Sequence, residues 1–263
     1  MPNLMTTDTP RSDEIAPHRV IPGFYASPEE RQGLVNELFD DVAQHYDRIV
    51  SLMSLGTGKA YRKSVLRRIG VCRGSRVLDV ACGTGLVSVA ATELVGADGE
   101  VMGVDPSEGM RRVAATRRGV RTCVGTADDL PFPDQSFDFV VMGYALRHVA
   151  DLVAAFSEMR RVLKPGGSVM ILEITAPEQR MARWMLRCYL KGVVPPVTLL
   201  MTGSRPAMRL MAYYWETIAE CVRPETILHA MERAGLEGPS RQTTMRIFNE
   251  YSARAPGAGA TGP

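Results

Sequence analysis

The middle of the chain alternates short apolar runs with stretches of helical periodicity, a pattern that predicts strands separated by helices. Strands are expected at 76–81, 101–105, 120–125, 137–144 and 168–174, with a last one at 245–254. Helices are expected at 86–95, 107–118, 152–164 and 224–236. Strands that alternate with helices favour right-handed βαβ units. We therefore predict a doubly wound α/β fold, with a mostly parallel sheet and helices on both faces.

The segments on either side of this core follow other patterns. Residues 1–27 are rich in Pro, Thr, Ser and charge, which predicts a flexible arm, and 256–263 predict a disordered tail. The domain between them, 28–255, begins with apolar residues at helical spacing, so that N-terminal helices are expected over 28–70. Residues 176–222 are too long for an ordinary loop and predict an inserted cap of two or three helices.

Composition narrows the class of protein. A net charge of +2 over 263 residues gives no strong field for nucleic acid, so no nucleic-acid partner is expected. The five cysteines are scattered and form no Cys/His cluster. We therefore expect no metal site and no disulfide framework, and favour a cytoplasmic location. No apolar run has the length of a membrane-spanning helix, and no signal peptide is recognisable.

The turn after the first strand carries the first candidate chemistry. Asp79 precedes Ala81, Gly83 and Gly85, so a strand runs into a Gly-x-Gly turn that opens a helix. Such a turn lets bare backbone approach a nucleotide-sized ligand. A dinucleotide-binding turn requires Gly or Ala three residues later, where this chain has Ser88. A carboxylate ahead of the glycines instead suits a ligand with an ammonium group, such as the methionine part of S-adenosylmethionine.

Carboxylates follow the next two strands as well. Asp105 lies where a carboxylate can take both ribose hydroxyls, and Asp128 can accept from an adenine amino group. Met110 and Leu130 are expected to flank the adenine ring. Taken singly, Asp105 could be a helix N-terminal residue and Asp128 a loop acid. The full set expected at the cofactor is Asp79, Ala81, Gly83, Gly85, Asp105, Pro106, Met110, Ala127, Asp128 and Tyr144.

Longer motifs around these residues resemble a known superfamily. DVACGTG, GVDPSEGM, GTADDLPFPDQSFDFVVMGYALRHV and RVLKPGGSVMILEI resemble the class I S-adenosylmethionine-dependent methyltransferases. Within that superfamily they are most similar to the ubiquinone/menaquinone-biosynthesis C-methyltransferase family. Residues 38–56, LFDDVAQHYDRIVSLMSLG, also resemble the entry segment of that family. The resemblance implies a Rossmann-like methyltransferase sheet, S-adenosylmethionine as cofactor, and a small-molecule acceptor.

Three departures from that family bear on the acceptor. YDRIV (46–50) lacks the family's Met and Asn, Leu-Arg-Asn becomes Leu-Arg-His (146–148), and GTGDL becomes GTGLV (83–87). The cofactor motifs remain intact, so a methyltransferase that acts on an apolar or aromatic acceptor is predicted, with C-methylation of a quinol-like ring as one option. The alternative is an O- or N-methyltransferase of specialised metabolism. A third, more distant alternative is a nucleotide-binding protein without enzymatic activity.

Three residues are candidates for catalysis. Methylation of a phenolic ring needs electron density, and therefore removal of a proton from a group with a pKa of about 10. The resemblance implies that Arg147 is the family's active-site arginine, so we expect it to stabilise a phenolate while His148 accepts the proton. Tyr46 matches a family tyrosine near the substrate pocket. The structural alternatives are an Arg147–carboxylate pair, a surface or capping role for His148, and a core position for Tyr46.

The cap contains three consecutive aromatic residues, Tyr213, Tyr214 and Trp215. Neighbours on a helix point about 100° apart, so at least one must face a pocket, a partner or solvent. All three are candidates for the substrate pocket. The cap's composition predicts an apolar or aromatic acceptor and leaves open a peripheral contact with a membrane or a homodimer seam.

Overall fold

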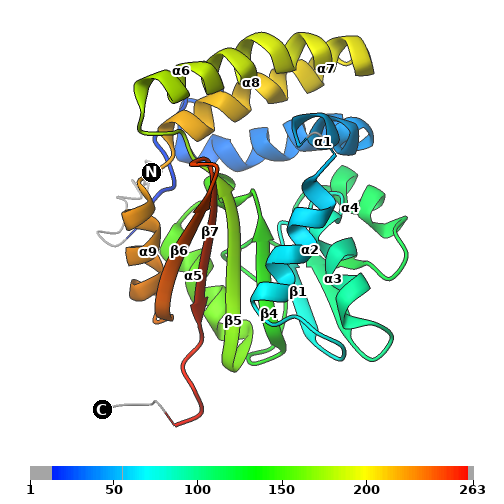
Figure 1. Ribbon diagram of the computed structural model, residues 1–263, viewed down its shortest axis with the longest axis vertical. Coiled ribbons are helices and arrows are strands. Elements are labelled where there is room, and N and C mark those ends of the chain that lie inside the picture. The colour runs from blue at the N-terminus through cyan, green and yellow to red at the C-terminus, as the bar shows by residue number, and fades with distance from the viewer. Residues whose placement is uncertain (1–13, 55, 260–263) are drawn as a thin grey trace, which may run out of the picture.

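The centre of the molecule is a seven-stranded sheet with the order β3-β2-β1-β4-β5-β7-β6 (Figure 1). The computed structural model describes residues 14–54 and 56–259. The strands are β1 (Arg76–Val80), β2 (Glu100–Val104), β3 (Arg121–Cys123), β4 (Phe137–Gly143), β5 (Leu163–Ile174), β6 (Glu237–Thr244) and β7 (Phe248–Arg254). The first five are parallel, whereas β7 runs antiparallel to β5 and to β6. The predicted doubly wound, mostly parallel α/β fold is confirmed.

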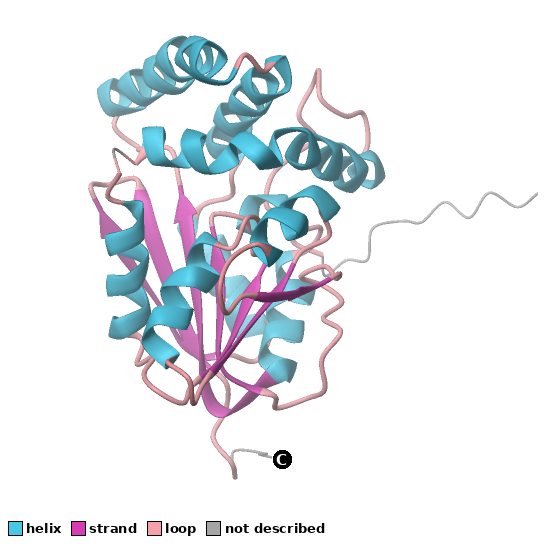
Figure 2. Cartoon of the chain, turned by 90° about the vertical axis from the view of Figure 1, so that its right-hand side faces the viewer, coloured by secondary structure: helices cyan, strands magenta, loops and turns pink. Residues whose placement is uncertain are grey.

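Helices cover both faces of the sheet, which lies between them in Figure 2. The α-helices are α1 (Pro28–Met53), α2 (Gly58–Arg68), α3 (Leu86–Val95), α4 (Glu108–Ala115), α5 (Leu152–Val162), α6 (Arg180–Arg187), α7 (Val194–Thr202), α8 (Arg205–Glu220) and α9 (Pro224–Arg233). Two short segments complete the set: the 3-10 turn η1 (Leu146–His148) and the π-helical turn η2 (Cys188–Val193). No helix in the described ranges is long and apolar enough to cross a membrane.

The alternation of side chains along β1 explains how two helical layers are held. Leu78 and Val80 are fully buried in the cluster that contains α5 and α9. Val77, which points to the opposite face, is buried with residues of α2 and α3. A strand buried on both faces needs an almost continuous apolar run, which RVLDV supplies. Asp79 is the one carboxylate in that run, and a buried carboxylate needs a partner that stabilises it.

The cap lies across the carboxyl ends of the parallel strands. In Figure 1, α6, α7 and α8 form the top of the molecule, and α1 runs beneath them. One apolar cluster joins α1 to the inserted helices through residues such as Leu38, Val42 and Leu210. The predicted insertion thus contains three α-helices and η2, and α1 supplies the surface on which they pack.

Two elements differ from the sequence-based expectation. The strand expected at 168–174 begins at Leu163, so β5 takes in the Pro-Gly-Gly segment that was expected to precede it. β6 was not predicted, because EGPSRQTT has no apolar alternation and is mostly exposed. It forms as an edge strand through backbone pairing with β7, and that pairing leaves no signal in side-chain pattern.

The prediction of a loose arm is wrong for residues 14–27. Ile21 and Tyr25 are buried in the cap cluster at 2% and 7% exposure. The Ile15 N–H donates to the Asp151 carboxylate at 3.0 Å, and the Val222 N–H donates to the Pro17 carbonyl at 2.8 Å. The polar composition of this segment predicted flexibility, but a few buried apolar residues are enough to anchor it on the cap. Residues 1–13 of the predicted arm and 260–263 of the predicted tail lie outside the described residues.

Candidate functional site

Two adjoining cavities lie at the carboxyl ends of the parallel strands, beneath the cap. They share part of their lining, to which Tyr46, Ala81, Gly83, Gly143 and Tyr144 contribute. Ala81 and Tyr144 have φ angles of 53° and 63°, a region that costs energy for residues other than glycine. Such strain concentrates at functional sites. The shared wall is therefore the point where ligands in the two cavities would meet.

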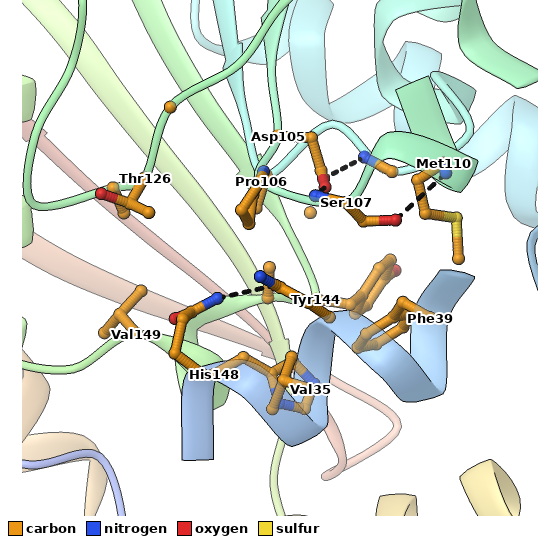
Figure 3. A pocket seen from close by; sticks show the side chains of 18 of the residues that line it. Val35, Phe39, Asp105, Pro106, Ser107, Met110, Thr126, Tyr144, His148 and Val149 are labelled. Carbon is orange, nitrogen blue, oxygen red and sulfur yellow. Dashed lines mark hydrogen bonds between the residues drawn. The ribbon is translucent and has the colours of Figure 1, made fainter. Parts of the chain in front are cut away.

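The first cavity is bounded by the loop after β2, the segment 125–128 and α1 (Figure 3). Asp105 is its main charged group. The Asp105 carboxylate accepts from the backbone N–H groups of Gly83 at 2.8 Å and Ser107 at 2.9 Å, and burial raises its pKa to about 6. Each carboxylate oxygen can accept more than one hydrogen bond, so capacity for a ligand's hydroxyls remains. The predicted residues Pro106, Met110, Ala127 and Asp128 line the same cavity.

The second cavity, of about 220 Å³, has a buried carboxylate in its wall. Asp79 is fully buried, and its Oδ2 accepts from the Ser88 hydroxyl at 2.6 Å. Its Oδ1 has no hydrogen-bond partner among the residues that the structure describes. Burial raises the pKa of Asp79 to about 7. An unpaired buried oxygen is costly and is rare unless a ligand or water completes it.

The remaining wall of the second cavity is mostly apolar and comes from the cap, from the end of α1 and from the start of β7. It includes Val50, Met53, Leu186, Tyr189, Leu190, Tyr214, Ile218 and Phe248. Of the three consecutive aromatics, Tyr214 alone belongs to this lining. The substrate-pocket assignments of the other two need correction: Tyr213 stacks on the His148 ring at 5.5 Å, and Trp215 packs inside the helical cluster. Their side chains diverge because they are helical neighbours.

Tyr46 stands where the two cavities join. Its hydroxyl lies 2.9 Å from the Tyr214 hydroxyl, an interaction between residues 168 positions apart. Burial raises the pKa of both phenols, so both stay protonated at neutral pH. One of the two hydroxyls donates to the other, and the remaining proton is available to a ligand.

Arg147 does not line either cavity, contrary to the expected contact with the acceptor. It is fully buried and forms an ion pair with Glu173, while its Nη1 donates to the Tyr144 carbonyl at 3.0 Å. Its guanidinium carbon lies 4.7 Å from the centroid of the Tyr214 ring. Burial disfavours the charge, but Glu173 opposes this, and the pKa of Arg147 is raised. Arg147 therefore has the structural role given above as the alternative, a pair with a carboxylate. It lies behind Tyr214, a residue of the cavity wall.

His148 faces the first cavity as a neutral base. Its ring meets Phe39 edge-on at 5.4 Å, while its Nδ1 lies 3.5 Å from the Tyr213 hydroxyl. Burial and the nearby charge of Arg147 hold the pKa of His148 well below its usual range. Within the described chain its buried Nε2 lacks a hydrogen-bond partner. The surface alternative is therefore wrong for this side chain.

Two predicted cofactor neighbours have structural roles instead. Gly85, with φ of 81°, caps α3, and a Cβ there would come within 3.3 Å of the Ala114 Cβ. It permits close helix packing and does not line a cavity in the described structure. Leu130 is buried in the main core and is not among the lining residues of either cavity. Neither residue therefore contributes to a cavity wall in the described structure, although both lie close in sequence to residues that do.

Sequence reasoning missed Arg62 of α2. It is 7% exposed, lines the second cavity, and its guanidinium carbon lies 5.8 Å from the Tyr144 ring centroid. Its Nε has no hydrogen-bond partner in the part of the chain that is described. The spacing of Tyr61, Val65 and Leu66 places Arg62 on the inner side of α2, the signal that could have identified it. Across the same ranges no cluster of three or more His, Cys, Asp or Glu could hold a metal ion.

Comparison with known proteins assigns the family. The model of the ubiE/COQ5 methyltransferase family matches residues 26–245. The chain belongs to this family. It is therefore an S-adenosylmethionine-dependent methyltransferase, as the sequence motifs predicted, and a small molecule is its methyl acceptor.

Relatives and solved structures agree with that assignment. The methyltransferase is 36% identical to demethylmenaquinone methyltransferase of Symbiobacterium thermophilum over 234 residues, 85% of this chain and 93% of that protein. It is 41% identical to the Staphylococcus aureus enzyme of the same name over 175 residues, 65% and 73% of the two chains. An S-adenosylmethionine-dependent methyltransferase of Aquifex aeolicus shares the fold at 18% identity, with a TM-score of 0.56 over 88% of this chain and all of that one.

Fold alone does not specify the reaction. The structure of the [4+2]-cyclase SpnF superposes with a TM-score of 0.62 at 18% identity, over 86% of this chain and 97% of that one. The reaction must therefore be argued from the site.

Proposed function

We propose that this methyltransferase transfers the methyl group of S-adenosylmethionine to a ring carbon of a demethylated prenyl-hydroquinone held in the second cavity. The observation that carries this proposal is the apolar cavity beneath the cap, which adjoins the carboxylate-lined first cavity at Tyr46 and Tyr144. An apolar wall with few polar groups suits a flat ring that carries a hydrocarbon chain. The names of the curated relatives point to the same class of acceptor.

The residues present fit the cofactor. We place the ribose at Asp105 and the adenine between Met110 and the 127–128 segment, both in the first cavity. The ammonium group lies at Asp79, so the methionine end of the cofactor reaches into the second cavity and the acceptor takes the apolar part of that cavity under the cap. The unpaired Oδ1 of Asp79 supports the last assignment, because a buried carboxylate with an open acceptor position is what a cationic ligand group requires. The bound cofactor supplies a methyl group on a positively charged sulfur. Gly83 has open space where a Cβ would lie, so its backbone is accessible to the ligand.

Binding of S-adenosylmethionine is expected to weaken as the pH falls from about 8 to about 5. Ionised Asp79 and Asp105 bind the ligand, and their pKa values of about 7 and about 6 in the ligand-free protein mean that both take up protons in this range. Binding near pH 7 should therefore release a proton. Calorimetry in buffers of different ionisation enthalpy measures this release, and Asp79→Asn should remove the component near pH 7. A pH-independent affinity would contradict the assignment of both carboxylates.

The acceptor must be oriented and made electron-rich. The free proton or lone pair of the Tyr46–Tyr214 pair can hydrogen-bond to a ring hydroxyl of the acceptor. Arg147 acts through that pair as a positioning residue, because its charge lies under the Tyr214 ring. The pKa of His148 lies well below its usual range, so His148 does not keep a proton taken from the acceptor, and we assign it hydrogen-bond acceptance. The proton that the acceptor loses on methylation passes to solvent water.

Tyr46→Phe is expected to lower kcat about tenfold, since it removes one oriented hydrogen bond. The affinity for S-adenosylmethionine should change little, because the phenyl ring retains the cavity wall. Tyr189→Phe is the matched control: it removes a hydroxyl from the same cavity that makes no hydrogen bond in the described structure. Steady-state kinetics of the two variants test the role of Tyr46, and equal rates for both would refute it.

The proposed reaction is tested with S-adenosylmethionine that carries a labelled methyl group and a demethylated prenyl-hydroquinone. Label on a ring carbon of the extracted product, located by NMR, is the expected result. Label on an oxygen would replace the proposal with an O-methyltransferase. No transfer by protein shown to bind the cofactor would overturn the choice of acceptor class.

A further inference from the structure

The outer surface of the cap carries large apolar side chains in contact with solvent. Met181, Trp184 and Met185 of α6 are 68%, 60% and 60% exposed, and α6 has no buried residue. Leu200 and Met201 of α7 continue this surface at 88% and 48% exposure. A cluster of exposed apolar residues of this size marks an interaction surface more often than chance exposure.

The chain segment that forms this surface is strongly basic. Between residues 179 and 215 the chain contains six Arg or Lys and no Asp or Glu. The six are Arg180, Arg183, Arg187, Lys191, Arg205 and Arg209, and all are exposed. Lys191 pairs with Glu216, whereas in the described ranges no carboxylate lies within ion-pair distance of the five arginines. The segment 179–215, which includes α6 and α7, therefore carries a local positive charge that the overall charge of +2 conceals.

The two kinds of side chain are segregated around α6. At about 100° per residue, Met181, Trp184 and Met185 share one side of the helix. The three arginines of α6 lie together on an adjacent side, as their spacing of three and four residues requires. A basic stripe beside an outward apolar stripe is the arrangement of helices that lie in a membrane interface.

We propose that α6 and the exposed part of α7 dock this methyltransferase on the surface of an anionic lipid membrane. Charge complementarity selects this occupant: acidic head groups attract the arginines, and the apolar side chains enter the boundary with the acyl chains. A second copy of the chain would present the same positive surface, so self-association here is opposed by repulsion. Figure 1 places α6 and α7 at the extreme end of the molecule, opposite the sheet, where a planar surface can reach them.

The position of this surface has a consequence for catalysis. Leu186 and Tyr189, which follow the exposed residues along α6 and η2, line the second cavity. Docking would thus bring the acceptor cavity next to the lipid phase, from which an apolar acceptor could enter. The docking itself does not depend on the proposed function, because it can be measured without cofactor or acceptor.

The test is co-sedimentation of the full chain with vesicles of equal parts phosphatidylglycerol and phosphatidylcholine, and with vesicles of phosphatidylcholine alone. Binding to the first and not to the second is expected. The Arg180→Gln/Arg187→Gln variant should bind the anionic vesicles roughly 25-fold more weakly, about fivefold for each arginine. Arg67→Gln/Arg118→Gln, which alters two exposed arginines in α2 and in the α4–β3 connection, is the charge-matched control and should bind normally. Equal binding by all three proteins would overturn the proposal.

Fluorescence identifies the contacting face. The chain has two tryptophans, of which Trp184 is 60% exposed and Trp215 is 6% exposed. A blue shift on addition of anionic vesicles, absent in Trp184→Phe, is expected. Binding without that shift would place the contact elsewhere. A dimer that Trp184→Ser disrupts, in protein that does not bind vesicles, would replace the lipid surface with a self-association surface.

Discussion

Arg147→Ala is expected to lower the free energy of unfolding by about 3–5 kcal/mol, because removing one partner of a buried ion pair leaves the other charge uncompensated. Both side chains of the Arg147–Glu173 pair are fully buried, and the Glu173 carboxylate also accepts from the Arg147 backbone N–H at 3.2 Å. The loss should appear in urea denaturation of the ligand-free protein. Binding of S-adenosylmethionine, measured below the unfolding transition, should change by only a few-fold, since Arg147 is absent from both cavity linings.

A second variant separates this structural role from direct catalysis. Adding Glu173→Gln to Arg147→Ala removes the stranded charge, so the double variant should be more stable than Arg147→Ala alone. Its kcat should stay reduced, because the charge under the Tyr214 ring is still missing. An Arg147→Ala protein with unchanged stability and a large loss of turnover would show that Arg147 contacts the acceptor, which the geometry opposes.

Asp79→Asn is expected to weaken binding of S-adenosylmethionine roughly 100-fold or more, as for loss of one partner of a buried hydrogen-bonded charge pair. Without ligand, the same variant should be as stable as the parent or more so at about pH 8. The folded-state pKa of Asp79 is raised to about 7 from 3.8, so its contribution to stability is present at low pH and is lost as the pH rises through that interval. Asparagine does not ionise and avoids this cost.

The opposite signs of the two effects make this test specific. Calorimetry with S-adenosylmethionine measures the affinity, and thermal unfolding of the ligand-free protein measures the stability. Asp98→Asn, which alters an exposed carboxylate at the far end of β1 from the site, should change neither quantity appreciably. An Asp79→Asn protein that bound the ligand normally would exclude the ammonium assignment, and one that was merely unstable would reduce Asp79 to a structural residue.

The sequence by itself determined the layered fold and much of the first cavity. Strand and helix periodicities are local properties of the sequence, and the nearly continuous apolar run of RVLDV is enough to predict a strand buried on both faces. The carboxyl ends of adjacent parallel strands meet at one edge of a sheet, so Asp79 and Asp105 could be brought together from topology alone. Tyr46 and His148, which the sequence singled out, line the first cavity, whereas the sequence left open which of Tyr213, Tyr214 and Trp215 would line a cavity.

Only the tertiary structure decided the features that depend on distant partners. Arg147 turned away from the cavities because Glu173, 26 residues later, offers it a charge in the buried wall. The Tyr46–Tyr214 pair, the anchoring of residues 14–27 and the edge strand β6 likewise rest on contacts between segments far apart in the chain. Such contacts leave no local periodicity. The sequence does not specify the direction in which each side chain points, because that depends on tertiary packing. At this site packing directs Tyr214 and Arg62 to the second cavity, and Tyr213, Trp215 and Arg147 away from both cavities.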